Sequence, residues 1–172
     1  SSLAAGQQAT LESLARLSQT VGDPEAEGSA AALVSKLQVS LRSSEANPSS
    51  TLLASEIVQS AQGVAGALNA ATDTVQDARL QADSQMSDAV GRIRTLLDQF
   101  KVANDAVIRG AGTAAELSDN LDERDRVLKQ LSEEIGIRTI TRPNNDLAIY
   151  TEGGVTLFEG VPRHIGFQAT ST

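Results

Sequence analysis

The stretch from Thr51 to Ile108 constrains the fold more than any other part of the chain, because it lacks proline and repeats apolar residues at helical spacing. The apolar ladder consists of Leu53, Ile57, Ala61, Val64, Leu68, Ala71, Val75, Ala78, Ala82, Met86, Ala89, Ile93, Leu96, Phe100, Ala103 and Val107. It covers 54 positions in fifteen steps, or 3.6 residues per step, the period of a straight α-helix rather than the 3.5 of a left-handed supercoil. An unbroken helix of this length would measure roughly 85 Å. The stretch predicts one very long helix, provided that Gly63, Gly66 and Gly91 do not interrupt it.

Two shorter helices are predicted before the long one, at residues 4–21 and 29–46, from leucines that recur every three or four residues. The first ends at the turn 22–24, and Pro48 ends the second because proline disfavours helix in the residue before it. A hydroxyl from segment 49–51 can then cap the long helix, predicted at 51–108.

A fourth helix is predicted at residues 114–135. Gly110 to Gly112 ends the long helix, and Thr113 with Glu116 has the spacing of a capping box. Since the connection is so short, this helix should run back antiparallel along the end of the long one.

The residues that follow change to short β-prone runs, at 137–141, 147–151 and 155–158, with a further strand predicted around 164–167. Turn residues separate the runs at Pro143–Asp146 and at Gly153-Gly154. Residues 137–168 should therefore form a small antiparallel sheet packed on the helices, and 169–172 a linker.

The predicted fold is mainly α: an elongated antiparallel helical bundle of residues 1–136 around one very long helix. The small antiparallel β-sheet is an α+β appendage at its C-terminal end. The ladder is either the buried stripe of this bundle or, where the shorter helices cannot cover it, a surface left for other subunits. The predicted core residues are Leu53, Ile57, Leu68, Ile93 and Leu128.

Composition excludes several classes of function. The 172 residues carry a net charge of −8 with a pI near 4.6, so nucleic acid and anionic membranes are not expected partners. No apolar run is long enough to span a bilayer, and no secretion signal precedes the helices. Without cysteine the chain has no disulfide or thiolate metal site. Because the chain begins with Ser rather than Met, we interpret it as a processed or excised piece.

No catalytic, cofactor or metal site is expected, and the protein is predicted not to be an enzyme. The single histidine, His164, has no cysteine or second histidine with which to share a metal. Gly153-Gly154 precedes a strand rather than a helix, so it predicts a hairpin turn and not a phosphate-binding loop.

The densest charge cluster lies in the fourth predicted helix, where Asp122 faces Arg126 and Asp125 faces Lys129 at a spacing of four residues. One interpretation is a solvated helix face with weak ion pairs. The other is that Arg124 and Asp125 fix the register of this helix against the long helix or a neighbouring subunit. On the second interpretation, Arg124, Asp125 and Arg126 are predicted subunit or interdomain contacts.

From about Leu11 to Gly160, the order of these features resembles the flagellar hook-associated protein 1 family. The resemblance lies in Ser49–Val58 at the start of the long helix and in Asn104–Ile108 near its end. Its most specific part is Leu121-Asp-Glu-Arg-Asp-Arg126, followed by a hairpin around Gly153-Gly154. The terminal segments that form the inner tube in that family have no counterpart in this sequence, so the resemblance implies a helical core fragment.

The resemblance implies a structural subunit of the bacterial flagellum at the hook–filament junction. The implied partners are the hook protein, the second junction protein, copies of the chain itself and an export chaperone that binds the absent termini. It also implies an extracellular location after type III export without a cleaved signal peptide, and a fragment that is monomeric in solution. The alternatives are another flagellar axial protein, flagellin-like or the second junction protein, and a generic helical interaction module.

Overall fold

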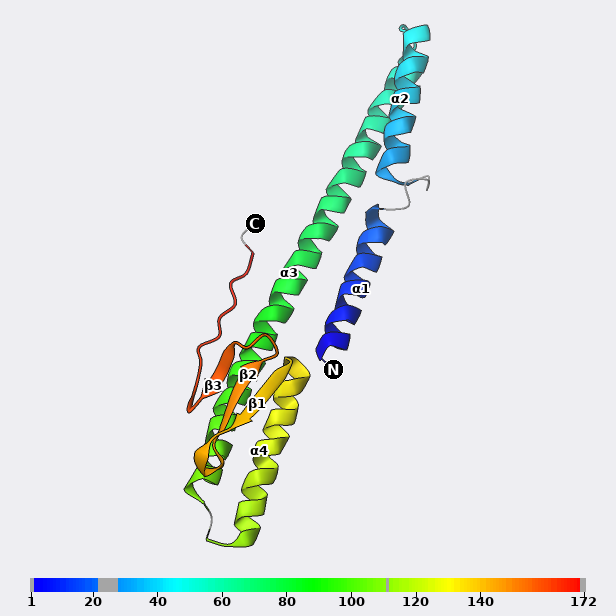
Figure 1. Cartoon of the computed structure of the whole chain (residues 1–172). Helices are drawn as coiled ribbons and strands as arrows, with labels where there is room; N and C mark the ends of the chain where they lie inside the picture. Colours follow the sequence, from blue (N-terminus) through cyan, green and yellow to red (C-terminus); the bar gives the residue numbers. More distant parts are fainter. Residues whose placement is uncertain (1, 22–27, 111, 171–172) are drawn as a thin grey trace. The chain divides into compact units, whose positions relative to one another are not determined.

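The computed structural model describes residues 2–21, 28–110 and 112–170, and it is mainly helical, with a long helix and a small antiparallel sheet as predicted (Figure 1). The helices are α1 (Ser2–Val21), α2 (Ala30–Ala46), α3 (Thr51–Arg109) and α4 (Ala114–Glu134). The strands are β1 (Ile137–Thr141), β2 (Leu147–Thr151), β3 (Thr156–Glu159) and β4 (Val161–Pro162), and the 3-10 turn η1 (Pro143–Asn145) joins β1 to β2. The predicted turn at 22–24 lies outside the described residues.

Helix α3 continues without a break through Gly63, Gly66 and Gly91. At its start, the Ser50 hydroxyl accepts the Leu53 N–H at 3.4 Å, so Ser50 caps the helix among the three predicted candidates. At its end, Gly110 adopts φ 77°, the left-handed conformation that glycine tolerates. Local sequence signals therefore set both ends of the longest element.

Helix α4 begins with the predicted capping box. The Thr113 hydroxyl accepts the Glu116 N–H at 3.2 Å, and the Glu116 carboxylate accepts the Thr113 N–H at 3.2 Å. Because these bonds satisfy N–H groups that lack partners at a helix start, they stabilise the turn after α3.

The chain divides into two compact units, residues 9–81 and residues 82–172 together with 1–8. The boundary between residues 81 and 82 falls inside α3. The predicted division into a bundle of residues 1–136 and a sheet of 137–168 stays a prediction, because these units are defined by compactness and not by element type.

In the unit of residues 9–81, α2 lies against α3. The Ser40 and Ser60 hydroxyls are 3.1 Å apart and buried, and a side chain at Gly63 would contact Leu33. Leu53 and Ile57 are half-buried. The prediction that Leu68 is a core residue is wrong, because its side chain is 54% exposed. The contacts of α2 with α3 described above involve Ser60 and Gly63, which precede Leu68 in the helix. No described side chain of α2 is therefore seen to bury Leu68.

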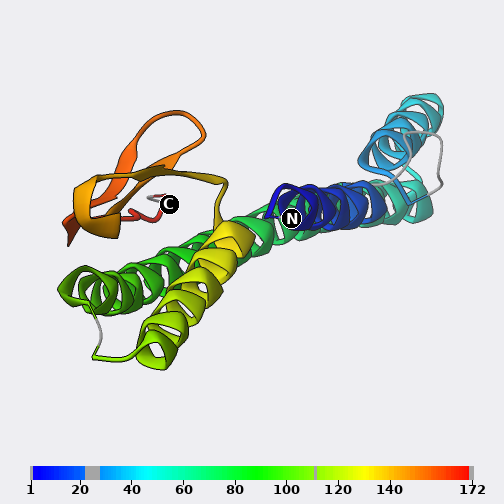
Figure 2. The ribbon, with the colours of Figure 1, turned by 60° about the horizontal axis from the view of Figure 1, so that its bottom comes forward.

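The apolar core lies in the other unit, where α3, α4 and the sheet meet (Figure 2). Its buried members are Ile93, Leu97 and Phe100 of α3, Val127 and Leu131 of α4, and Leu147, Ile149, Leu157 and Phe158 of the sheet. This confirms the prediction for Ile93, and Leu128 packs partly buried against the same cluster. The rings of Phe100 and Phe158 meet edge to face, with centroids 4.9 Å apart. The sheet thus supplies about half of the core.

Helix α4 runs antiparallel to the C-terminal half of α3, as the short connection predicted. Arg92 bonds Glu134 while Asn104 bonds Arg124, so residue numbers rise along one helix as they fall along the other (Figure 1).

The sheet is antiparallel with the order β1-β2-β3-β4. The Gly153-Gly154 hairpin is present between β2 and β3, with Gly154 at φ 85°. The predicted strand around His164–Phe167 is wrong, because the fourth strand is Val161–Pro162. Further along the chain, two residues bond to α3: Arg94 Nε donates to the Ile165 carbonyl at 2.5 Å, and the Thr170 N–H donates to Asp83 at 3.0 Å.

Candidate functional site

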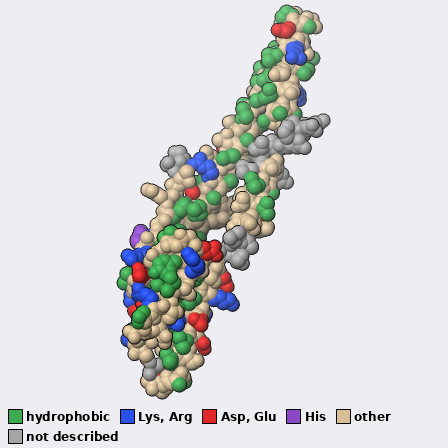
Figure 3. All heavy atoms as spheres, in the orientation of Figure 1, with side chains coloured by type: hydrophobic (Ala, Val, Ile, Leu, Met, Phe, Trp, Pro, Cys, Tyr) green, Lys and Arg blue, Asp and Glu red, His purple; other side chains and the backbone are tan. Residues whose placement is uncertain are grey.

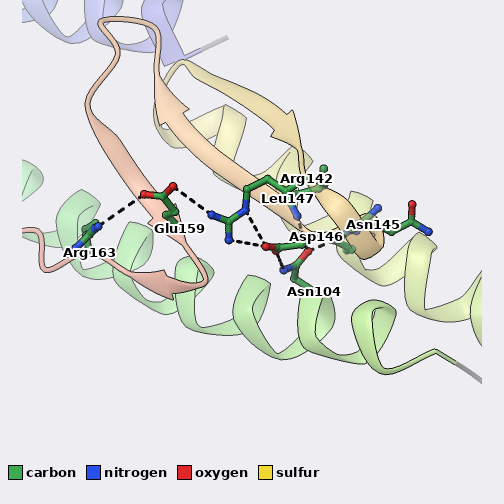
Figure 4. Close-up of polar contacts among 8 residues, drawn as sticks. Asn104, Arg142, Asn145, Asp146, Leu147, Glu159 and Arg163 are labelled. Atoms are coloured by element: carbon green, nitrogen blue, oxygen red, sulfur yellow. Dashed lines mark hydrogen bonds and ion pairs between the residues drawn. The ribbon is translucent and has the colours of Figure 1, made fainter.

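The best-defined polar site joins α3, α4 and the sheet, and Asn104 lies at its centre. The Asn104 side chain is fully buried in the core-facing side of α3. Its Oδ1 accepts the Leu147 N–H at 3.2 Å, and its Nδ2 donates to Asp146 Oδ1 at 2.7 Å (Figure 4). One side-chain amide therefore pairs with both a backbone and a side-chain group at the start of β2.

Arg124 approaches the same amide from α4. Its side chain is buried, and Nη1 donates to the Asn145 carbonyl at 2.7 Å and to Asn104 Oδ1 at 3.5 Å. The structure thus places Arg124 at a contact between α4, α3 and η1 within one chain. Its part in a contact between subunits stays a prediction.

A chain of ion pairs continues from Asn104 along the sheet (Figure 4). Arg142 Nε donates to Asp146 Oδ2 at 2.9 Å, and Arg142 Nη1 donates to Glu159 Oε1 at 3.1 Å. Arg163 lies 3.8 Å from the other Glu159 oxygen. Asn144 and Asn145 adopt φ values of 62° and 59°, which turn the chain so that Asp146 faces Asn104. Asparagine tolerates this left-handed conformation better than most residues.

The electrostatics of the site centre on Asp146, whose side chain is only 14% exposed. Burial alone would raise the pKa of this carboxyl, but hydrogen bonds from Asn104 and Arg142 and the Arg142 charge lower it below its usual value. The hydrogen bond to Asp146 likewise raises the pKa of Arg142. Both side chains are therefore charged at neutral pH, and the hydrogen bond from Asn104 to Asp146 holds the end of η1 against α3.

Asp125 and Arg126 lie on the exposed side of α4, away from the Asn104 amide. Arg126 pairs with Glu123, with Nε–Oε2 at 2.7 Å, rather than with the predicted Asp122. That hydrogen bond lowers the pKa of Glu123. Of the three predicted contact residues, Arg124 thus packs inward, whereas Asp125 and Arg126 face solvent in this chain.

The sequence matches the family described as the flagellar hook-associated protein FlgK helical domain over residues 14–169. The chain belongs to this family. The FlgK helical domain match includes α2, α3, α4 and all four strands, and therefore the whole Asn104 site.

A solved structure of the flagellar hook junction protein FlgK from Burkholderia pseudomallei has the same fold. The two superpose with a TM-score of 0.79 at 23% sequence identity, over 92% of this chain and 28% of that protein. The chain thus corresponds to little more than a quarter of the length of this FlgK protein. No curated protein matches the chain significantly.

Sequence reasoning missed the site around Asn104 and Asp146. A signal was present, because Asn104 follows Phe100 by four residues and precedes Val107 by three, which places it on the apolar side of α3. A polar residue at such a position must find hydrogen-bond partners inside the fold. The partner Asp146 lay within a segment that the sequence identified only as a turn.

Other kinds of site find little support in the described part of the chain. His164 is exposed beside Arg94 and Asp98, at a shallow hollow next to β4. Among the described residues, no three His, Cys, Asp or Glu side chains gather as metal ligands. No described helix is long and apolar enough to span a bilayer.

Exposed apolar side chains concentrate in the unit of residues 9–81. Figure 3 shows hydrophobic side chains at the surface of α2 and of the N-terminal half of α3. The most exposed members there are Leu52, Leu11, Val39, Leu80, Val58, Leu14 and Leu68. Such a surface is typical of proteins that bind other polypeptides.

Proposed function

We propose that this chain is the helical part of a structural subunit at the junction between hook and filament of the bacterial flagellum. The membership of residues 14–169 in the FlgK helical domain family carries the proposal. In this role the chain performs no catalysis. It supplies a helical and β-sheet framework whose exposed apolar side chains contact neighbouring subunits.

The proposed partners are the hook protein, the second junction protein and further copies of the same subunit. The surface apolar side chains of α2 and α3, including Val39, Leu68 and Leu80, support contacts with other chains. We also propose an extracellular location, reached by flagellar export without a cleaved signal peptide, and an export chaperone bound by segments outside this chain.

Complementation tests the proposal. The full-length protein that contains this chain is expressed in a motile bacterium whose own junction subunit has been deleted. We expect filaments to return, and gold-labelled antibody against the chain to mark the hook–filament boundary in electron micrographs. Label along the whole filament would indicate a flagellin-like protein instead. Unflagellated cells that nevertheless secrete the folded protein would contradict the proposal.

A further inference from the structure

The segment that follows β4 is bonded to α3 at two separate points. Residues 163–170, here termed the strap, form neither helix nor strand (Figure 1). Near the start of the strap, Arg94 of α3 donates from Nε to the Ile165 carbonyl at 2.5 Å. At the far end, the Asp83 carboxylate of α3 accepts both the N–H and the hydroxyl of Thr170, at 3.0 and 3.3 Å. Charged side chains of one helix thus hold the strap at both points.

The spacing of these two contacts indicates that the strap is fully extended. Asp83 and Arg94 are eleven residues apart in α3, or about 16.5 Å at 1.5 Å per residue. Ile165 and Thr170 are five residues apart, which is also about 16.5 Å at the 3.3 Å per residue of extended chain. Residue numbers rise along the strap as they fall along α3. The strap therefore runs antiparallel to the helix with no slack between the two contacts.

Alternate residues of the strap are covered by the rest of the protein. Ile165 packs partly buried against the apolar core and Phe167 is half-buried, whereas Gly166 and Gln168 are exposed. This alternation is typical of an extended segment with one covered face. The strap thus adds apolar contacts to its two polar ones.

The part of α3 that the strap follows belongs to the C-terminal compact unit but lies outside its apolar core. That unit begins within α3 at residue 82, next to Asp83. Among the described residues, the buried apolar side chains of α3 begin only at Ile93. Residues 83–92 therefore depend more on surface contacts, such as those with the strap, than on core packing.

We propose that the strap is a detachable conformational switch. When the strap is docked, residues 82–92 of α3 share the stability of the C-terminal core. When it is released, these residues open more readily than the core, and Ile165 and Phe167 become exposed. The strap detaches before the sheet does, because β2 and β3 are held by backbone ladders and fully buried side chains. The inference concerns this chain alone and does not depend on the proposed function.

Hydrogen exchange of Asp83→Ala read by mass spectrometry tests the proposal. Asp88→Ala is the matched control, since Asp88 is exposed on the same helix and no described group hydrogen-bonds it. Both variants replace a helical aspartate by alanine, so the changes in charge and helix propensity are the same. Circular dichroism establishes that both fold.

We expect residues 82–92 to exchange about tenfold faster in Asp83→Ala than in Asp88→Ala, because the hydrogen bonds of a charged group are lost. Exchange of residues 97–107 should be the same in the two variants. Equal exchange of residues 82–92 would overturn the proposal. Faster exchange throughout 82–107 would overturn it as well, because the strap would then not act separately from the core.

An engineered disulfide tests whether the strap docks where the structure places it. The chain has no cysteine, so two substitutions allow a single bridge. The Thr170 hydroxyl lies 3.3 Å from the Asp83 carboxylate, so two sulfurs introduced there are close enough to bond. We expect Asp83→Cys with Thr170→Cys to form the bridge in mild oxidant, as measured by mass spectrometry without reductant. Asp88→Cys with Thr170→Cys should stay reduced, because Asp88 lies about 140° further round the helix.

The bridge should also restore what Asp83→Ala removes. With the bridge formed, residues 82–92 should exchange at least as slowly as in wild type, and reduction should return them to the fast exchange of Asp83→Ala. Equal bridge formation in both cysteine pairs would overturn the proposal, because the segment would then move freely. Bridge formation with no change in exchange would also overturn it, since α3 would not respond to the strap.

Discussion

At the scale of single residues, Asn104 and Asp146 connect elements that are distant in sequence. Asn104 is fully buried, and its hydrogen bonds reach β2, η1 and α4. An unsatisfied buried polar group costs about 1–3 kcal/mol, so each partner depends on the others for its stability. Arg126, two residues from Arg124 on the same helix, bonds the exposed side chains of Glu123 and Gln130, and such surface contacts contribute little. The two arginines differ in burial because they lie on different sides of α4.

The Asp146 carboxylate should make the stability of the fold depend on pH. Its pKa is lowered in the folded chain, so its contribution is fully present above the ordinary aspartate pKa of about 3.9 and is lost as pH falls through the lower folded value. Asp146→Asn should reduce the free energy of unfolding at pH 7 by about 1–3 kcal/mol. The deficit should shrink toward pH 2.

Urea unfolding measured from pH 2 to pH 7 checks this expectation. Val102→Ala is a suitable control, because Val102 is 69% exposed on the same helix as Asn104 and carries no ionisable group. It should leave the pH profile of the wild type unchanged. A constant deficit for Asp146→Asn at every pH would show that the lowered pKa does not stabilise the fold.

At the scale of elements, the β2–β3 hairpin depends on one glycine of its pair. Gly154 adopts φ 85°, whereas Gly153 does not have a positive φ. Open space surrounds Gly154, so a methyl group there would meet no clash, only an unfavourable backbone conformation. Gly154→Ala should therefore cost roughly 1–2 kcal/mol.

Gly153→Ala is the matched control for that experiment. A side chain at Gly153 would touch only the Thr151 hydroxyl, at an ordinary contact distance of 3.8 Å. Thermal or urea unfolding of the two variants should thus separate them clearly. Equal stability of the two would refute the strain assigned to residue 154.

At the scale of the whole molecule, buried apolar residues are distributed unevenly. Every described apolar side chain that is buried lies between Ile93 and Phe158, while the buried residues described between 28 and 81 are three serines. Local stability follows buried apolar contacts. We therefore expect amides of residues 51–81 to open at a lower free energy than those of residues 93–107, although both belong to α3.

Hydrogen exchange read by mass spectrometry measures this difference. Leu97→Ala, which empties a fully buried position, should lower the opening free energy of residues 93–107 by about 2–5 kcal/mol. The same variant should leave exchange of residues 51–81 unaffected. A uniform decrease along α3 would mean that the helix opens as one cooperative element.

The sequence predicted what depends on local signals. The absence of proline and the 3.6-residue ladder identified α3, Thr113 with Glu116 identified the start of α4, and Gly153-Gly154 identified the hairpin. Contacts between residues far apart in the sequence were harder to predict. Leu68 continues the apolar ladder yet is exposed, because periodicity does not show which turns of a helix a neighbour covers.

The Asn104 site could be predicted only in part for the same reason. The position of Asn104 on the apolar side of α3 indicates a buried polar group, but it does not indicate which partner lies opposite. Asp146 lies 42 residues further along the chain, and its approach depends on the left-handed conformations of Asn144 and Asn145. Asparagine favours such angles locally, but a turn motif does not indicate which helix the residue after it will meet.

The arrangement around Asn104 also has a use in spectroscopy. Its two amide protons and its carbonyl oxygen sense the start of β2, the η1 turn and the Arg124 side chain at once. Magnetic resonance of this one ¹⁵N-labelled side chain would therefore report on the packing of three elements. A single pair of peaks could then follow how the domain responds to load, temperature or assembly.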